Sequence, residues 1–364
     1  MTTDLKTLRD KIDAIDNQIL DLLNQRADVV LDVGHTKAGQ QREYYVPSRE
    51  QAIYQRLTAA NPGPFPDGAV RKVFREIISA SLSLEQPMMV AFLGPQTTFT
   101  HVAAMQQFGL SAQLVPMKSI PSVFEEVERG RAHYGVVPVE NSTEGIVNHT
   151  LDMFISSELR VIAEVLLEIS HDLLSRSGQI ERITKVVSHP QALAQCRRWL
   201  EENLPDIPLV DVASTAAAAQ MAAEDESAAA IAGHAAAEQF GIQVVKSRIE
   251  DNPNNYTRFL VIGRNIPDKS GHDKTSLMFS VKDEPGILYR MLEPFSKRQI
   301  NLAKIESRPM KQKAWEYIFF LDLEGHVTDP AIAEAIEELR SCCHFLKVLG
   351  SYPLSKQNSA EDTP

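Results

Sequence analysis

The sequence predicts a multidomain protein in which an all-α segment, an α/β segment and an α+β segment follow one another. The first observation is the length of 364 residues, which at about 150 residues per domain favours two or three domains. The second is that apolar residues first recur at helical spacing and then gather in short strand-like runs. The third is a βαββαβ order near the C-terminus. These changes of pattern along the chain predict domains over residues 1–86, 89–265 and 273–352.

The N-terminal segment is predicted to hold three helices. Apolar residues recur every three or four positions from residue 5 to about 33, which indicates one amphipathic helix of about 50 Å if it runs to residue 39. Ser48 is the expected N-cap of a second helix over residues 49–60. A breaker at residues 61–68 precedes a third helix over residues 69–85. So small a segment cannot bury the apolar stripe of its long helix, so we expect dimerisation through paired long helices.

The central segment alternates strands with helices. Buried strands are expected near residues 89–93, 134–139, 185–187 and 259–263, and alanine-rich helices over residues 215–224 and 228–240. This alternation predicts an α/β fold with largely parallel sheets.

The C-terminal segment follows a polar linker over residues 265–273. Strands are expected at residues 275–281, 300–306, 315–323 and 344–349, and helices at residues 286–297 and 329–340. The βαββαβ order is that of a ferredoxin-like α+β domain. Residues 353–364 are polar and are expected to form a disordered tail.

Composition excludes several classes of function. Hydrophobic residues make up 43% and charged residues 23%, as in an ordinary globular protein. A net charge of −11 without a basic block is unfavourable for nucleic acid or anionic membranes. No apolar run is long enough to span a membrane, and no signal peptide is visible. The odd count of three cysteines, two of them adjacent, favours a reducing cytoplasm.

Cofactor motifs are missing as well. Neither a P-loop nor a dinucleotide fingerprint occurs, and the histidines lack the spacing of a metal site. Isolated histidines such as His101, His149 and His189 are expected to cap helices or to lie in the core. We therefore expect neither a metal nor another cofactor.

Charged residues in the helical segment form an ordered set. An arbitrary set of helical charges usually makes surface salt bridges. This one resembles the all-helical chorismate mutase family over residues 5–86. The matching residues are Arg9, Arg26, Lys37 within Val33-Gly34-x-x-Lys37, Arg49 and Glu50 after Pro47, and Ser81 and Glu85 on the third helix.

The resemblance implies a pericyclic rearrangement of chorismate, a dicarboxylate, to prephenate. Such a reaction requires the reactive conformer to be held and the charge on the breaking ether oxygen to be stabilised. By resemblance, Arg9 and Arg26 from opposite subunits bind the carboxylates, a role that suits the planar fork of arginine. Lys37 would bond the ether oxygen and Glu50 the ring hydroxyl. Arg49 and Ser81 would support the carboxylates.

Glu85 departs from the common family pattern, which has glutamine as a second hydrogen-bond donor to the ether oxygen. A carboxylate cannot donate, so Glu85 would have to be protonated. This leads to the hypothesis that the mutase rate falls as pH rises and that Glu85→Gln flattens the profile.

Polar clusters follow several strands of the central segment, where α/β proteins usually bind ligands. A lone Ser/Thr cluster is usually a helix cap. Five such clusters in one segment resemble prephenate dehydratase over residues 89–265, with Pro138-x-Glu140-Asn141 and Thr257-Arg258-Phe259 as the most specific elements. The first loop departs from the family pattern, because Thr97 stands where glycine is common.

The dehydratase resemblance implies two lobes similar to a periplasmic binding protein and the conversion of prephenate to phenylpyruvate. Aromatisation drives this decarboxylation and loss of hydroxyl, so a modest acid can suffice. Thr257 would be the key hydroxyl, and Arg258 the partner of the pyruvyl carboxylate. Glu140 and Asn141 are further catalytic candidates. The remaining pocket candidates are Thr98, Ser142, Thr143, Ser188, Gln191 and Phe259.

The C-terminal segment carries Pro285-Gly286-Ile287-Leu288 at a strand-to-helix turn and Glu306-Ser307-Arg308-Pro309 at the end of a strand. Alone, these are a turn and a capped strand end. With the βαββαβ order they resemble an ACT regulatory domain of the phenylalanine-sensing kind. The resemblance implies that L-phenylalanine binds between paired domains and inhibits the dehydratase. The effector candidates are Gly286, Ile287, Leu288, Asn301, Glu306, Ser307, Arg308 and Pro309.

Taken together, the three resemblances predict a bifunctional enzyme whose first product is its second substrate. Its partners would be chorismate, prephenate, L-phenylalanine and one or three further copies of the chain. Two alternatives stay open: a dehydratase whose helical segment only dimerises, and a non-catalytic amino-acid sensor.

Overall fold

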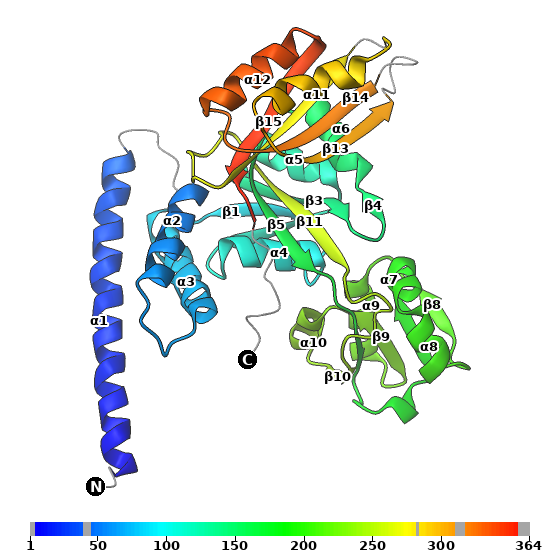
Figure 1. Cartoon of the computed structure of the whole chain (residues 1–364). Helices are drawn as coiled ribbons and strands as arrows, with labels where there is room; N and C mark the ends of the chain where they lie inside the picture. The colour runs from blue at the N-terminus through cyan, green and yellow to red at the C-terminus, as the bar shows by residue number, and fades with distance from the viewer. Residues whose placement is uncertain (1–3, 39–44, 282–283, 310–316, 356–364) are drawn as a thin grey trace. The chain divides into compact units, whose positions relative to one another are not determined.

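The structure is a computed structural model, and it divides into two compact units that are described separately (Figure 1). It describes residues 4–38, 45–281, 284–309 and 317–355, and only the backbone of Lys37 and Ala38. The predicted tail therefore lies largely outside the described residues.

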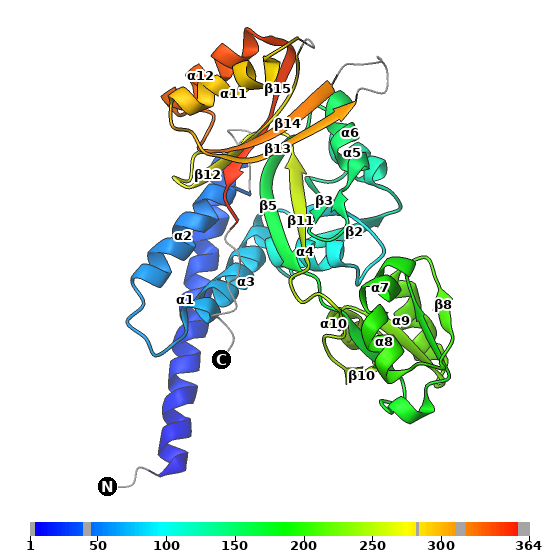
Figure 2. The ribbon, with the colours of Figure 1, turned by 45° about the vertical axis from the view of Figure 1, so that its right-hand side comes forward.

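The first unit contains three helices, as predicted. They are α1 (Leu5–Ala38), α2 (Pro47–Ala59) and α3 (Asp67–Glu85). Helix α1 contacts α3 and extends well beyond both shorter helices (Figures 1 and 2). Ser48 does not cap α2: the helix begins one residue earlier at Pro47, with Val46 as N-cap. Proline at the first helical position has no N–H to satisfy and a φ already suited to the helix.

Helix α1 exposes a long apolar stripe. Ile12, Ile15 and Ile19 are each at least half exposed, and Leu5 and Leu22 more so. Such a stripe on a helix of 34 residues is the feature from which pairing of long helices was expected.

The second unit begins with a lobe built on a mixed sheet in the order β2-β1-β3-β11-β5, with β4 beside β3. Strands β1 and β3 are parallel, whereas β11 runs antiparallel to both β3 and β5. The sheet was expected to be largely parallel, and β11 departs from this expectation. The chain leaves this lobe through β5 and returns to it through β11, so these two strands run in opposite directions. The elements are β1 (Met89–Leu93), α4 (Phe99–Phe108), β2 (Gln113–Met117), α5 (Ile120–Glu128), β3 (Tyr134–Asn141), β4 (Gly145–Ile146), α6 (Asn148–Ser156), β5 (Arg160–Glu168) and β11 (Tyr256–Gly263).

A second lobe is inserted between β5 and β11, and two chain segments join it to the first (Figure 2). Its sheet has the order β10-β6-β9-β7-β8. The elements are β6 (Asp172–Ser175), the short helix η1 (Ile180–Arg182), β7 (Lys185–Ser188), α7 (Pro190–Gln195), α8 (Arg197–Asn203), β8 (Leu209–Asp211), α9 (Thr215–Glu224), β9 (Ala228–Ala232), α10 (His234–Phe240) and β10 (Gln243–Lys246).

One alanine-rich run was wrongly predicted. Residues 228–240 were expected to be a single helix, but Ala228–Ala232 is the fully buried central strand β9 and only His234–Phe240 is helical. Strand β9 pairs with both β6 and β7, so sheet pairing and burial outweigh the helical propensity of alanine.

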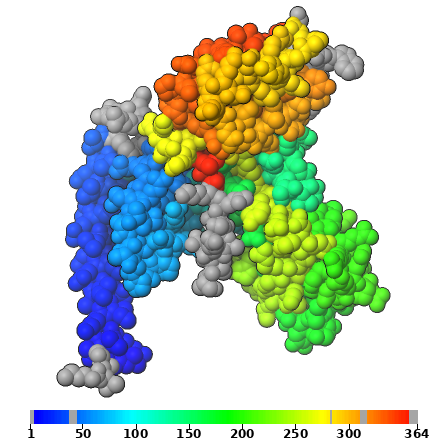
Figure 3. Space-filling model, in the orientation of Figure 1, coloured from blue at the N-terminus to red at the C-terminus, as the bar shows by residue number. Residues whose placement is uncertain are grey.

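The C-terminal part has the predicted βαββαβ order, with a sheet ordered β13-β14-β12-β15. The space-filling view shows its helix α11, in yellow to orange, at the surface (Figure 3). The elements are β12 (Asp273–Val281), α11 (Ile287–Lys297), β13 (Leu302–Pro309), β14 (Tyr317–Glu324), α12 (Pro330–Arg340) and β15 (Cys343–Pro353).

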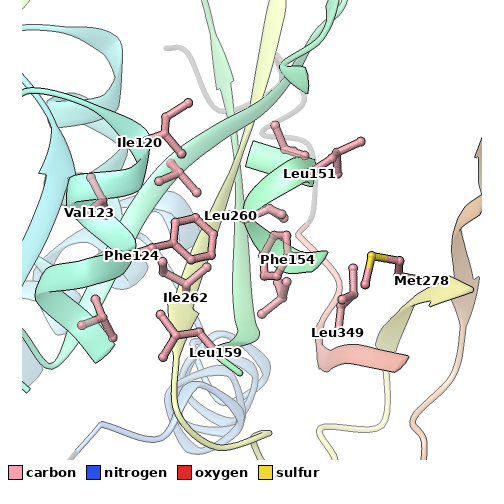
Figure 4. Packing of buried hydrophobic residues seen from close by; sticks show 14 of the residues in the cluster. Ile120, Val123, Phe124, Leu151, Phe154, Leu159, Leu260, Ile262, Met278 and Leu349 are labelled. Carbon is pink, nitrogen blue, oxygen red and sulfur yellow. The ribbon is translucent and has the colours of Figure 1, made fainter. Parts of the chain in front are cut away.

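The C-terminal sheet and the first lobe share one hydrophobic core. Met278 and Leu349 of the C-terminal sheet belong to the same buried cluster as Leu151 and Phe154 of the first lobe (Figure 4). Strand β15 also passes so close to β5 that a Cβ on Gly350 would lie 2.0 Å from the Val161 carbonyl oxygen. The two sheets therefore pack as one body.

Candidate functional site

The helical unit brings several of the predicted mutase residues together near one end of α1. The Arg26 guanidinium donates to the Ser81 hydroxyl, which donates to the Ile77 carbonyl at 2.6 Å. Partial burial is the main cause that lowers the pKa of Arg26, and the positive charge of Arg49 lowers it further. A guanidinium held by a serine and crowded by a second cation is poised to bind an anion.

The contact between Gly34 and Glu85 explains why glycine stands at this position of the Val33-Gly34-x-x-Lys37 motif. A Cβ at Gly34 would lie 3.0 Å from Cγ of Glu85, so glycine makes room for the Glu85 side chain against α1. Glu85 therefore lies two turns along α1 from Arg26. The Lys37 side chain lies outside the described residues.

Glu50 lies on α2, where burial raises its pKa to about 8 and the Arg75 guanidinium opposes that rise. Burial is the main cause that raises the pKa of Tyr54, and the negative charge of Glu50 raises it further. Sequence reasoning did not select Arg75 or Tyr54. Tyr54 follows Glu50 by four positions on α2, so helical spacing could have indicated it. Nothing in the sequence shows that Arg75 of α3 faces Glu50.

Arg9 is not brought to the other mutase residues of its own chain. It is exposed on α1 and lies 17 residues before Arg26, which is about 25 Å along the helix. Arg9 and Arg26 of one chain are therefore too far apart to bind the same small molecule.

The dehydratase candidates Asn141, Thr143 and Thr257 meet at the ends of β3 and β11. Thr257 is the register partner of Asn141, and both side chains are buried. Asn141 Nδ2 donates to Thr257 Oγ1 at 2.8 Å. The backbone N–H groups of Thr143 and Glu144 both donate to Asn141 Oδ1 at 2.9 Å.

These bonds fix the direction of the Thr257 hydroxyl. Because Asn141 Oδ1 accepts two backbone N–H groups, its Nδ2 must be the group that faces Thr257. Thr257 Oγ1 therefore accepts, and its own proton remains available for another acceptor. A hydroxyl with a free proton at a sheet edge can donate to a bound ligand.

Asn255 is a site residue that sequence reasoning did not select. Its Oδ1 accepts from Asn141 Nδ2 at 2.8 Å, from Thr143 Oγ1 at 3.3 Å and from Ser142 Oγ at 3.4 Å. It is almost fully buried. Its position two residues before Thr257, hence on the same face of an extended chain, was the signal that could have identified it.

Glu140 and Arg258 face away from Thr257. Each lies next to a clustered residue, and neighbouring strand residues point to opposite faces. Glu140 Oε2 lies 2.6 Å from Lys304 Nζ on β13. Arg258 bonds Glu164 at 2.8 Å, Asp322 at 2.6 Å and the Tyr352 hydroxyl at 2.9 Å. Arg258 was expected to hold a substrate carboxylate, but its guanidinium is already bound to two carboxylates.

The other pocket candidates are spread over both lobes. Thr98 caps the start of α4, where its hydroxyl donates to the Pro95 carbonyl at 2.9 Å. Ser188 is fully buried in the second lobe and donates to the Ile231 carbonyl at 2.6 Å. Gln191 is the second residue of α7 in the same lobe, where its N–H donates to His189 Nδ1 at 3.3 Å. Phe259 is 2% exposed and belongs to the core.

The loop before α4 has the conformation for which glycine is favoured. Thr97 has φ 67°, in the left-handed region, although it is β-branched. The Thr97 N–H donates to His101 Nδ1 at 3.2 Å. His101 and His189 thus accept backbone N–H groups, as expected of capping histidines. Among the described residues, no three His, Cys, Asp or Glu side chains gather as a metal site.

The effector candidates occupy two places in the C-terminal part. Gly286 has φ 79° and caps α11, and Leu288 after it is 56% exposed. On β13, Glu306 and Arg308 are half-buried whereas Ser307 and Pro309 are exposed. Asn301 donates to Glu324 Oε1 at 2.8 Å.

Domain-family models match the chain in three consecutive stretches. They are chorismate mutase type II over residues 8–86, prephenate dehydratase over residues 90–267 and the ACT domain over residues 275–341. The fold and the site thus define the class of two-activity enzymes that carry a helical mutase, a two-lobed dehydratase and an ACT domain on one chain.

Full-length relatives place the chain more narrowly. It is 50% identical to the bifunctional chorismate mutase/prephenate dehydratase of Aquifex aeolicus over 96% of this chain and 98% of that one. It is 45% identical to the protein of the same name from Neisseria gonorrhoeae over 95% and 96%. The chain belongs to the bifunctional chorismate mutase/prephenate dehydratase family.

Solved structures agree with this placement. The prephenate dehydratase of Arthrobacter aurescens in complex with L-Phe is 39% identical, with a TM-score of 0.68 over 73% of this chain and 90% of that one. The prephenate dehydratase of Staphylococcus aureus is 29% identical, with a TM-score of 0.65 over 73% and 100%. No helix among the described residues is long and apolar enough to cross a membrane.

Proposed function

We propose that this chain converts chorismate to prephenate in its helical unit and prephenate to phenylpyruvate in its two-lobed part. The observation that carries the proposal is the match to a bifunctional relative over 96% of the chain. The proposed domain bounds are residues 1–86, 89–265 and 273–352.

The mutase step needs placed charges rather than a nucleophile. Arg26, held by Ser81, binds one substrate carboxylate, and Arg49 adds positive charge beside it. Arg9 of a second chain binds the other carboxylate, so a dimer through the α1 stripe completes the site. Lys37 and Glu85 act on the ether oxygen, and Glu50 on the ring hydroxyl. Holding the reactive conformer is the main source of rate.

The dehydratase step is assigned to the cluster around Thr257. The ring carboxylate of prephenate leaves as carbon dioxide, its electron pair completes the aromatic ring, and the ring hydroxyl leaves with one proton as water. The free proton of Thr257 is positioned to bond that hydroxyl, because Asn141 fills a lone pair of Oγ1. Ser142, Thr143 and Asn255 hold Asn141 in place, and the second lobe, which carries Gln191 and the buried Ser188, supplies the opposite wall of the pocket.

Regulation by L-phenylalanine is proposed for the ACT domain. The relative from Arthrobacter aurescens was solved in complex with L-Phe. The N-terminus of α11 at Gly286 offers backbone N–H groups to a carboxylate. Leu288 and Ser307 are exposed and available to a paired ACT domain, so we propose a homodimer or homotetramer. The proposed location is the cytoplasm, as the cysteine usage indicated.

One assay tests the proposal. Purified full-length chain is given chorismate, and chorismate and phenylpyruvate are followed by absorbance with and without L-phenylalanine. We expect phenylpyruvate to form without any added cofactor and to form more slowly with L-phenylalanine. A chain that only bound amino acids would leave chorismate unchanged.

A further inference from the structure

Strand β13 of the ACT domain contacts the dehydratase part on both sides of the loop that carries Asn141, Ser142 and Thr143. Before the loop, Lys304 Nζ lies 2.6 Å from Glu140 Oε2. After the loop, Arg308 Nη1 lies 2.9 Å from Asp152 Oδ1 and donates to the Asn148 carbonyl at 3.0 Å. Both contacts come from one strand.

The same strand presents different residues on its opposite face. Residues Lys304, Glu306 and Arg308 are half-buried, whereas Ile305 and Ser307 between them are exposed. This alternation follows from the pleat, which sends successive side chains to opposite faces. Lys304 and Arg308 are four residues apart, about 13 Å along the strand. Strand β13 thus joins the exposed effector face to the dehydratase loop without an intervening element.

The Lys304 contact is linked directly to the catalytic cluster through Glu140, whereas the Arg308 contact holds the start of α6, just after the loop. Glu140 immediately precedes Asn141, and its register partner Arg258 immediately follows Thr257. A shift of Glu140 along its strand therefore moves Asn141, whose amide orients the Thr257 hydroxyl at 2.8 Å. The bonds of Asn141 to the N–H groups of Thr143 and Glu144 would move with it.

We propose that Lys304 and Arg308 form a two-point clamp on residues 140–152 and are positioning residues through which β13 changes the geometry of Asn141 and Thr257 when L-phenylalanine binds. This rests on the proposed regulation by L-phenylalanine. The loop keeps its own bonds among Asn141, Thr257 and Asn255, so the clamp is not needed for the uninhibited rate. It is needed for a change at the effector face to reach Thr257.

The test uses the full-length chain with Lys304→Met, Asp152→Asn and both together. Lys304→Arg preserves the charge. Lys185→Met removes a lysine that pairs with Asp225 at 2.8 Å in the second lobe and serves as the matched control. For each chain we would measure dehydratase rate against prephenate concentration, with and without L-phenylalanine, and L-phenylalanine binding by calorimetry.

The double variant is expected to bind L-phenylalanine and to keep its uninhibited rate within about twofold. Inhibition by saturating L-phenylalanine should fall roughly tenfold, since each partly exposed ion pair shifts an equilibrium by about two- to fivefold. By reciprocity, the effect of prephenate on L-phenylalanine binding should shrink by a similar factor. Lys304→Arg and Lys185→Met should remain inhibited. Full inhibition of the double variant would overturn the clamp.

Hydrogen exchange of the peptide over residues 141–147 tests the clamp independently of regulation by L-phenylalanine. Without any L-phenylalanine, this peptide should exchange several-fold faster in the double variant than in Lys185→Met, because the anchor on Glu140 is gone and the Arg308 anchor has lost its ion pair. Unchanged exchange would contradict the clamp even if regulation is real. A wild-type chain that neither binds nor responds to L-phenylalanine would instead overturn the proposed regulation, and with it the route from effector to loop.

Discussion

The direction of a few side chains decides the chemistry of both sites. Motifs identified Asn141 and Thr257 from the sequence, and the structure places them 2.8 Å apart. The same motifs also indicated Glu140 and Arg258, which point into the C-terminal sheet. A sequence motif does not reveal which strand face a second domain covers, so these neighbours could not be separated by motif alone.

Glu50 gives the helical unit a predicted pH dependence. Its folded-state pKa is raised to about 8, while the unfolded chain releases the same proton near 4.5. Between these values the folded state binds more protons than the unfolded one, so stability falls as pH rises, by up to about 1.4 kcal/mol per pH unit. Glu50→Gln removes the ionisation with little change of shape.

Thermal unfolding of the full chain checks this. The variant and the wild type should have similar midpoints at pH 5, and the variant should be the more stable at pH 9. A difference that is the same at both pH values would show that Glu50 is ionised throughout. The Arg75 guanidinium opposes the raised pKa of Glu50, so Arg75→Gln should enlarge the gain in stability that Glu50→Gln gives at pH 9.

At the scale of elements, sequence spacing predicted the helices and strands of the N- and C-terminal segments and four strands of the central one, but not their pairing partners. The period of α1 and the βαββαβ order were strong signals, because they repeat over many residues. The strand Ala228–Ala232 was missed because alanine favours helices and only the surrounding sheet makes it a strand. Likewise, nothing local shows that β15 packs against β5.

That contact between strands makes a second prediction. Gly350→Ala would place a Cβ 2.0 Å from the Val161 carbonyl oxygen, so the strands must separate. Overpacking of this kind costs about 1–3 kcal/mol, and backbone on both sides of the contact places this site at the upper end. Because β15 and β5 contribute to one core cluster, the Gly350→Ala variant should lose dehydratase activity at a lower temperature than the wild type.

His344→Ala is the control for that variant. His344 is exposed on the same strand, and its truncation should change stability by less than about 0.5 kcal/mol. Chemical denaturation of both variants gives the comparison. Equal midpoints would mean that β15 does not lie against β5 in solution.

At the scale of the whole molecule, the net charge of −11 conceals local cationic sites. Arg26 and Arg49 lie near each other in the helical unit, while Lys304 and Arg308 connect the ACT sheet to the dehydratase part. The order of the three parts was predictable from the sequence, because each carries its own motif. The coupling between them was not, because it depends on which faces of β3 and β13 meet.

The measurement that tests the central claim most directly is product analysis of full-length Thr257→Val supplied with chorismate. Valine keeps the shape of threonine and removes the hydroxyl whose proton Asn141 leaves free. We predict that chorismate is consumed at the wild-type rate, that prephenate accumulates, and that phenylpyruvate forms at least about 100-fold more slowly, within the range of a lost acid. Phenylpyruvate formation at the wild-type rate would contradict the account.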